Sequence, residues 1–187
     1  MKYLIAGLGN VGEEYSGTRH NIGFMILDAL ADVSGVTFKD GRFAFTSSFK
    51  YKSRIFSLIK PATYMNRSGQ AVRYWLKKEK ISPERLLVVL DDTALPFGTL
   101  RLRPSGGDGG HNGLLHINQI LSTSQYARLR FGIGSDFFPG RQVEHVLGEW
   151  ADQEKQRLEE RIRLACDAIL SYGTIGIERT MNEFNNR

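Results

Sequence analysis

The chain has 187 residues, a single cysteine and a formal charge of +5, with 41% hydrophobic and 24% charged residues. Those fractions are typical of a soluble globular protein, and one cysteine excludes an intramolecular disulfide framework. No apolar run approaches the roughly 18 residues that suggest a membrane span. We therefore expect a cytoplasmic protein without membrane contact, whose moderate positive charge favours an anionic partner such as nucleic acid.

The first third of the chain is predicted to contain a strand, a helix and a hairpin. Residues 3–9 are an apolar run closed by glycines, which indicates a buried strand and not a secretory signal. A helix is predicted from Asn21 to about Val33, because apolar residues recur at helical spacing, and the Asn21 side chain is expected to cap it. Residues 43–52 and 54–60 are interpreted as the two strands of a hairpin.

The rest of the chain alternates between helix-like and strand-like segments. In order, we expect a helix after Pro61, strands at 86–92 and 99–104, a glycine-rich loop at 105–113, a helix at 114–121, a strand at 127–134 and a helix at 152–172. Two apolar stripes are expected to face the core, namely Val72, Trp75 and Leu76 in the first of these helices and Leu158, Ile162, Ala165, Cys166 and Ile169 in the last.

No linker, internal repeat or low-complexity segment divides the chain, so we expect one domain over residues 1–187. Alternating strands and helices predict a three-layer α/β/α fold around a twisted, mixed, mostly parallel sheet. In such sheets, ligands bind beyond the carboxyl ends of the strands. Asn10 follows the first strand and Asp91 lies at the end of the strand at 86–92, so both are predicted to lie in that region.

The stretch GLGNVG at 7–12 matches the glycine fingerprint of dinucleotide-binding folds. That fingerprint requires a helix that starts within the glycine motif, whereas the helical pattern here begins only near Ile22. The acidic residues that follow, Asp28 and Asp32, would lie within that helix and not at the tip of a second strand. A nucleotide-dependent enzyme is therefore disfavoured, and the glycines are interpreted as sharp turns beside a site.

Several polar residues are expected at the ends of elements: Asn10, Tyr15, His20, Asn66, Asp91, Asp92, His111 and Asn112. Taken singly, each is explained as a turn, a helix start or a cap, and His111 beside two glycines as a solvent-exposed side chain. Taken together, they suggest a hydrolase in which a histidine acts as general base on water, an aspartate orients it and asparagine amides hold a carbonyl.

Other catalytic classes are poorly supported. The only cysteine lies on an apolar helix stripe, where burial is expected, and no GxSxG elbow is present. The four histidines stand at 20, 111, 116 and 145, and no pair has the i, i+4 spacing of a helical zinc site. We therefore expect no metal and no cofactor.

Five ordered motifs carry a resemblance to a known family: GLGN…EY…TRHNIG, KPATYMNRSG, LDD…LPFG, GGHNG and RLRFGIG. Together they resemble bacterial-type peptidyl-tRNA hydrolase from about residue 3 to residue 148. The resemblance implies a monomeric cytoplasmic enzyme of three-layer α/β fold. Such an enzyme cleaves the ester between a peptide and the 3′ end of tRNA without a metal.

The resemblance also implies roles for individual residues. His20 would be the catalytic base, Asp91 its orienting partner, and Asn10 the residue that senses whether the substrate amine is blocked. The substrate- and tRNA-binding positions would be Asn66, Asn112 and His111, with Tyr15 and Tyr64 lining the cleft and Arg103 and Arg130 gripping the 5′ phosphate of the tRNA.

The chain departs from the family pattern at a few positions. Val11 replaces the proline usual after the asparagine, Tyr64 stands where phenylalanine is common, and Asp108 sits in the glycine loop. None of these removes a catalytic residue type. The strongest alternative is an RNA-binding α/β module that grips a backbone without catalysis. Loss of His20 or Asp91 would favour that alternative, and both are present.

Overall fold

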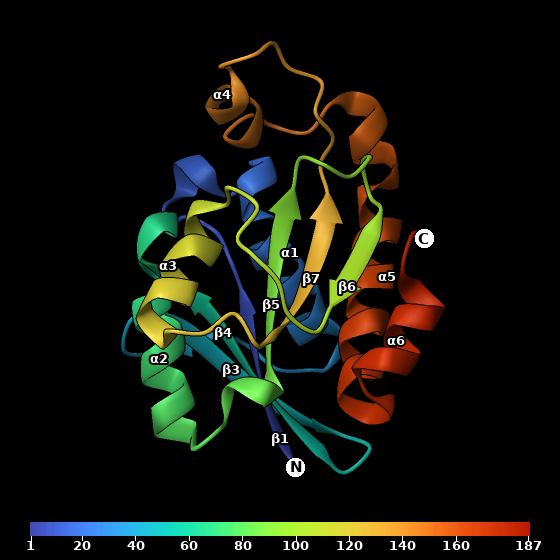
Figure 1. The fold of residues 1–187 in the computed structure, drawn as a ribbon. Coiled ribbons are helices and arrows are strands. Elements are labelled where there is room, and N and C mark those ends of the chain that lie inside the picture. The colour runs from blue at the N-terminus through green and yellow to red at the C-terminus, as the bar shows by residue number, and fades with distance from the viewer.

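A seven-stranded mixed sheet runs through the middle of the molecule in the computed structural model, which describes residues 1–187 (Figure 1). The strand order is β2-β3-β4-β1-β5-β7-β6. The four central strands, β4, β1, β5 and β7, are parallel, whereas β3, β2 and β6 are added antiparallel to their neighbours. The strands are β1 Lys2–Gly7, β2 Lys39–Asp40, β3 Ala44–Tyr51, β4 Arg54–Pro61, β5 Leu86–Asp92, β6 Leu100–Arg103 and β7 Ala127–Gly132. The predicted strands and the hairpin are confirmed.

Helices cover both faces of the sheet. They are α1 Ile22–Val33, α2 Ser68–Glu79, α3 Asn112–Leu121, α4 Gln142–Val146, α5 Asp152–Ile175 and α6 Ile177–Phe184. A core cluster that contains Trp75 and Ile117 joins α2 and α3 to one face, and a second cluster that contains Leu27 and Ile169 joins α1 and α5 to the other. The expected three-layer α/β/α fold is therefore confirmed.

Two helices were not predicted from the sequence, and they have different roles. Helix α4 stands beyond the carboxyl ends of β5 and β7, above the sheet in Figure 1. Helix α6 follows α5 and packs beside β6. The last residues then pair with that edge strand, because the Leu100 N–H donates to the Arg187 carbonyl oxygen and the Asn186 N–H donates to that of Leu100. No helix has the length and apolar character needed to span a membrane.

The glycine motif serves close packing more than turning. Helix α1 begins at Ile22, after short 3₁₀ turns at Glu13–Tyr15 and Arg19–Asn21, so it starts outside the glycine motif, as expected. A Cβ added to Gly7 would lie 2.4 Å from the Gly23 carbonyl oxygen, so β1 and α1 cross too closely for any side chain. Within the motif only Gly12 has a left-handed φ, 121°, so the sharp-turn interpretation holds there alone.

Candidate active site

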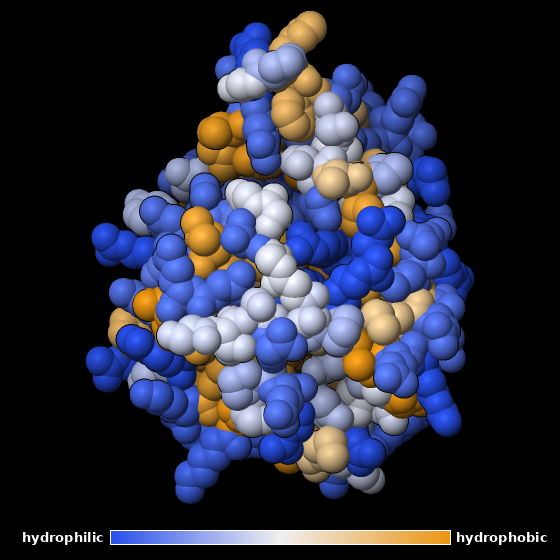
Figure 2. All heavy atoms as spheres, viewed as in Figure 1, coloured by the Kyte–Doolittle hydropathy of each residue, from blue (hydrophilic) through white to orange (hydrophobic).

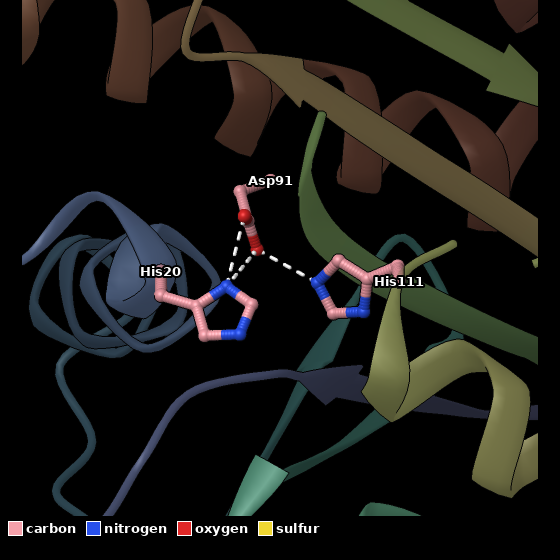
Figure 3. A group of neighbouring side chains, drawn as sticks. All are labelled: His20, Asp91 and His111. Atoms are coloured by element: carbon pink, nitrogen blue, oxygen red, sulfur yellow. Dashed lines mark hydrogen bonds and ion pairs between the residues drawn. The ribbon is translucent and has the colours of Figure 1, made fainter. Parts of the chain in front are cut away.

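Three side chains from distant parts of the chain meet beyond the carboxyl end of β5 (Figure 3). Asp91 lies near the end of that strand, His20 on the 3₁₀ turn before α1, and His111 directly before α3. The Nδ1 of His20 lies 2.9 Å from each carboxylate oxygen of Asp91. The Nε2 of His111 lies 2.8 Å from Asp91 Oδ1. One carboxylate therefore lies between two imidazoles.

The charge state of Asp91 fixes where the imidazole protons sit. Burial alone would raise the pKa of the Asp91 carboxyl, but His111 and His20 together hold that pKa well below its usual range. An ionised carboxylate only accepts hydrogen bonds, so His20 Nδ1 and His111 Nε2 each carry the proton that they donate. In the neutral ring of His20 the other nitrogen, Nε2, then keeps a free lone pair and points away from Asp91 (Figure 3).

His111 is not the solvent-exposed side chain that its glycine neighbours suggested. Its side chain is 8% exposed. While Nε2 donates to Asp91, Nδ1 accepts the Leu114 N–H at 3.4 Å and caps α3. The two hydrogen bonds hold His111 in one tautomer. Its observed partner is Asp91, a contact that the sequence analysis did not anticipate.

Asn10 is held by backbone and side-chain contacts on both sides. Its backbone N–H donates to Asn21 Oδ1 at 2.8 Å, and its carbonyl oxygen accepts from Asn21 Nδ2 at 2.9 Å. Its own Oδ1 accepts the Met65 N–H at 2.8 Å. The Met65 contact orients the amide of Asn10 and leaves both of its N–H donors for a further partner. The expectation that Asn21 caps α1 is wrong, because its side chain is used by Asn10 and makes no cap hydrogen bond.

A polar cavity of about 180 Å³ opens beside these groups. Figure 2 shows hydrophilic side chains around a hollow on this face, below the more hydrophobic group of side chains in the α4 region. The predicted site residues that line the cavity are His20, Asp91, His111, Asn112 and Arg130. Its far wall comes from Gln142, Val143 and Val146 of α4, which the sequence analysis did not identify.

The other predicted residues lie outside this cavity. Tyr64 is 62% exposed. Asn66 is also exposed, on the 3₁₀ turn Met65–Arg67, which packs against α3. Tyr15 is half-buried on an earlier 3₁₀ turn. The cavity lining therefore includes the two histidines and Asp91, and it does not include Asn10, Tyr15, Tyr64, Asn66 or Arg103.

Four arginines share one face of the β6–β7 pair. The register sets Arg101 opposite Arg130 and Arg103 opposite Arg128, and residues opposite one another in a sheet share a face. Arg103 is exposed. Arg130 lines the cavity, donates to the Gly107 carbonyl oxygen and lies 3.6 Å from Asp92 Oδ2. Arg103 and Arg130 therefore lie on the same face of the sheet.

Arg128 of β7 contacts the glycine-rich loop and does not lie at the surface. It is fully buried and has no carboxylate partner. Its guanidinium donates to the carbonyl oxygens of Gly106, Gly107, Ser124 and Tyr126. Burial lowers the pKa of Arg128. The side chain fastens the glycine-rich loop over β7, a role that its place in a basic strand did not reveal.

The two imidazoles and the carboxylate that meet beyond β5 could also hold a metal ion. The ligand atoms of His20, Asp91 and His111 all lie within 4.8 Å of one another. Helical spacing between histidines could not reveal this group, because its members come from three separate elements.

Comparisons with known proteins agree with the motifs. The family model described as peptidyl-tRNA hydrolase matches residues 4–187. The peptidyl-tRNA hydrolases of Phocaeicola vulgatus and Cytophaga hutchinsonii are 56% and 54% identical over 187 residues, the full length of each chain. A crystal structure of peptidyl-tRNA hydrolase from Acinetobacter baumannii superposes with a TM-score of 0.92 at 36% identity, covering 98% of this chain and 94% of that one. The chain belongs to the peptidyl-tRNA hydrolase family of enzymes.

Proposed function

We propose that this enzyme hydrolyses the ester between a peptide, or an N-blocked aminoacyl group, and the 3′ end of tRNA, and so releases free tRNA for reuse in translation. The observation that carries the mechanism is the free Nε2 of His20, whose ring is held by Asp91 at the wall of the cavity. His20 acts as general base on a water molecule, and Asp91 keeps the ring in the required tautomer.

The steps follow from this arrangement. Water attacks the ester carbonyl while His20 Nε2 takes its proton, and the Asp91 carboxylate stabilises the imidazolium that forms. The tetrahedral intermediate then collapses, and His20 returns the proton to the leaving 3′ oxygen of the tRNA. An aminoacyl ester is already activated, so its hydrolysis needs only modest assistance. A general base accelerates such a reaction by about 10²- to 10⁴-fold, which is a sufficient contribution from one residue. His111, donating to the same carboxylate, positions Asp91.

Asn10 supplies the preference for a blocked amine. Its Oδ1 accepts the Met65 N–H, which orients the amide and leaves both of its N–H donors for the substrate. A peptide carbonyl accepts such a donor, whereas the ammonium of a free aminoacyl-tRNA is itself a donor and leaves the pair unmatched. Asn66 and Asn112 hold the substrate, and Tyr15 and Tyr64 line the binding cleft at its rim.

Arg103 and Arg130 bind the tRNA 5′ phosphate from the arginine face of β6 and β7. Cations so placed add affinity for any tRNA, because phosphate contacts carry no sequence information. The enzyme acts in the cytoplasm as a monomer, with no metal or cofactor required for turnover.

The direct test is release of free tRNA from N-acetyl-aminoacyl-tRNA in the presence of EDTA. We expect hydrolysis at an undiminished rate, and slow hydrolysis of the same tRNA with an unblocked amine. Binding of the tRNA without release would identify an RNA-binding module and contradict the proposal.

A further inference from the structure

We infer that His20, Asp91 and His111 also form a binding site for a divalent transition-metal ion such as Zn²⁺, and that an ion bound there stops hydrolysis. The binding half of this inference stands on the geometry of the three side chains. The inhibitory half rests on the proposed function, in which His20 is the base.

The donor set suits zinc and related ions. Two imidazole nitrogens and one carboxylate oxygen are the ligands of many catalytic zinc sites, in which a fourth position stays open. Ca²⁺ and Mg²⁺ prefer all-oxygen surroundings, so imidazoles select Zn²⁺, Co²⁺, Ni²⁺ or Cu²⁺ instead.

The ligand atoms are already close to the spacing that a metal needs. Asp91 Oδ1 lies 2.9 Å from His20 Nδ1 and 2.8 Å from His111 Nε2. Zinc–ligand bonds of about 2.0–2.2 Å set neighbouring ligand atoms of a tetrahedral ion about 3.3 Å apart. The two imidazole nitrogens lie within 4.8 Å of each other, so side-chain rotations that lengthen the two oxygen–nitrogen separations and bring the nitrogens together would admit the ion.

The surroundings allow an ion to enter and leave. All three residues line the cavity, so a fourth ligand position faces solvent. Asp92 lines the same cavity, but Arg130 pairs with it and offsets its charge, so the negative charge at the site comes from Asp91. The ligands come from a strand end and from the entrances of two helices, so their backbones are held by the fold.

Metal binding would remove the catalytic lone pair by changing a tautomer. In the state that hydrolyses the ester, His20 carries its proton on Nδ1 and has a free pair on Nε2. A metal takes the pair on Nδ1, so the Nδ1 proton leaves to solvent and Nε2 of the neutral ring acquires one. Charge on the imidazole does not change, but the nitrogen that should accept a proton from water is already protonated.

The hydrogen bond between His111 and the Leu114 N–H limits the affinity. When the metal takes the Nε2 pair of His111, the ring proton moves to Nδ1, which then no longer accepts the Leu114 N–H. That bond, at 3.4 Å, is long and costs little to lose. We therefore expect a reversible site, weaker than the closed sites of structural zinc proteins.

The binding test uses metal-free full-length enzyme, with Zn²⁺ alone as the titrant in a calorimeter. We expect one Zn²⁺ ion to bind per chain. Mg²⁺ added in a second titration should not compete with it. His20→Asn and His111→Asn should each weaken binding by more than about tenfold, since even outer partners of metal ligands are worth about 10- to 100-fold in affinity.

The two remaining histidines provide matched controls. His116→Asn and His145→Asn remove imidazoles that contact the Gly69 N–H and the Ile133 carbonyl oxygen, away from Asp91. These variants should bind Zn²⁺ as the unaltered chain does. Equal loss in the controls, or full binding in both site variants, would overturn the site. Imidazole ¹⁵N shifts of His20 and His111 on addition of Zn²⁺ test the unaltered chain and do not depend on how a variant folds.

Turnover then separates the two halves. We expect Zn²⁺ to stop hydrolysis at the concentration at which it binds, and EDTA to restore it. Hydrolysis with no zinc binding would reject the site and leave the proposed function intact. Zinc binding to a chain that hydrolyses no blocked aminoacyl-tRNA would reject the function and keep the site. Undiminished hydrolysis by the zinc-bound enzyme would reject His20 as the base.

Discussion

Asn21 holds Asn10 through both backbone groups of that residue, with its Oδ1 accepting the N–H at 2.8 Å and its Nδ2 donating to the carbonyl oxygen at 2.9 Å. Both side chains are buried. The amide that precedes α1 therefore fixes the chain after β1, and with it the donors that Asn10 presents.

Asn21→Ala is expected to lower kcat/KM by about tenfold or more while the enzyme still folds. Each buried hydrogen bond is worth about 0.5–1.5 kcal/mol, and the loss of two releases Asn10. Steady-state kinetics of the single and double variants check this, because Asn10→Ala with Asn21→Ala should be little worse than Asn10→Ala alone. Asn182→Ala, on the exposed side of α6, is the control. Multiplicative losses would mean that Asn21 acts independently of Asn10.

Arg19 ties the cavity wall of α4 to the turn that carries His20. It donates to the His145 carbonyl oxygen at 3.1 Å and pairs with Glu154 at 3.2 Å. Arg19→Ala should speed hydrogen exchange in residues 142–149 and lower kcat/KM. Arg19→Lys should restore only part of the exchange protection and of kcat/KM, because an ammonium lacks the planar fork of a guanidinium. Hydrogen exchange measured by mass spectrometry checks this. Arg141→Ala, in the same segment but paired only with exposed Glu144, should change little. Unchanged exchange in Arg19→Ala would show that other contacts hold the wall.

The sequence predicted the long elements because each buries a periodic apolar stripe. It missed α4, which has no buried residue, and α6, where only Thr180 and Phe184 are buried. The cap at Asn21 was wrong for a different reason. Its side chain pairs with Asn10, 11 positions earlier, and no local rule announces that preference.

The site was predictable in residue type but not in connectivity. His20 and Asp91 were expected as a pair, and their contact is present at 2.9 Å. The second imidazole on Asp91 could not be foreseen, because His111 follows a glycine-rich loop whose path depends on distant contacts. One such contact is buried Arg128, which binds the Gly106 and Gly107 carbonyl oxygens.

His116 makes the stability of the α2–α3 contact depend on pH. Its Nδ1 accepts the Gly69 N–H at 3.0 Å, and burial, followed by the charges of Arg67 and Arg73, lowers its pKa. A folded-state pKa below the unfolded value of about 6.5 favours the neutral ring, so this stabilisation is complete above about pH 6.5 and falls as the pH drops further. His116→Asn keeps an acceptor without titrating. The urea midpoint of this variant should fall less between pH 7.5 and pH 5.5 than the urea midpoint of the unaltered chain. Equal falls in the urea midpoints of the two proteins would exclude His116 as the source of this pH dependence.

Arg103→Ala separates tRNA binding from ester chemistry. Arg103 is exposed, whereas removing Arg130 would also free Gly107 and Asp92. We expect KM to rise more than kcat falls. The plot of log K for tRNA binding against log salt concentration should become shallower by roughly 0.7 to 0.9, the contribution of one phosphate contact. Both effects should vanish on a short oligonucleotide ester that lacks the 5′ end.

Arg163→Ala, an exposed arginine on α5, is the matched control for charge. Equal loss on the full tRNA and the short ester would place Arg103 near the ester or in support of the fold, and would end its assignment to the 5′ phosphate.

The central claim is that His20 and Asp91 act as one catalytic unit, and a double-mutant cycle on kcat tests it most directly. With folding of each variant verified by circular dichroism, His20→Ala should lose at least about 10²-fold in kcat. Asp91→Asn should also lower kcat, and the double variant should be little worse than His20→Ala, because members of one unit are non-additive. Near-normal turnover by folded His20→Ala, or losses that multiply in the double variant, would contradict the account.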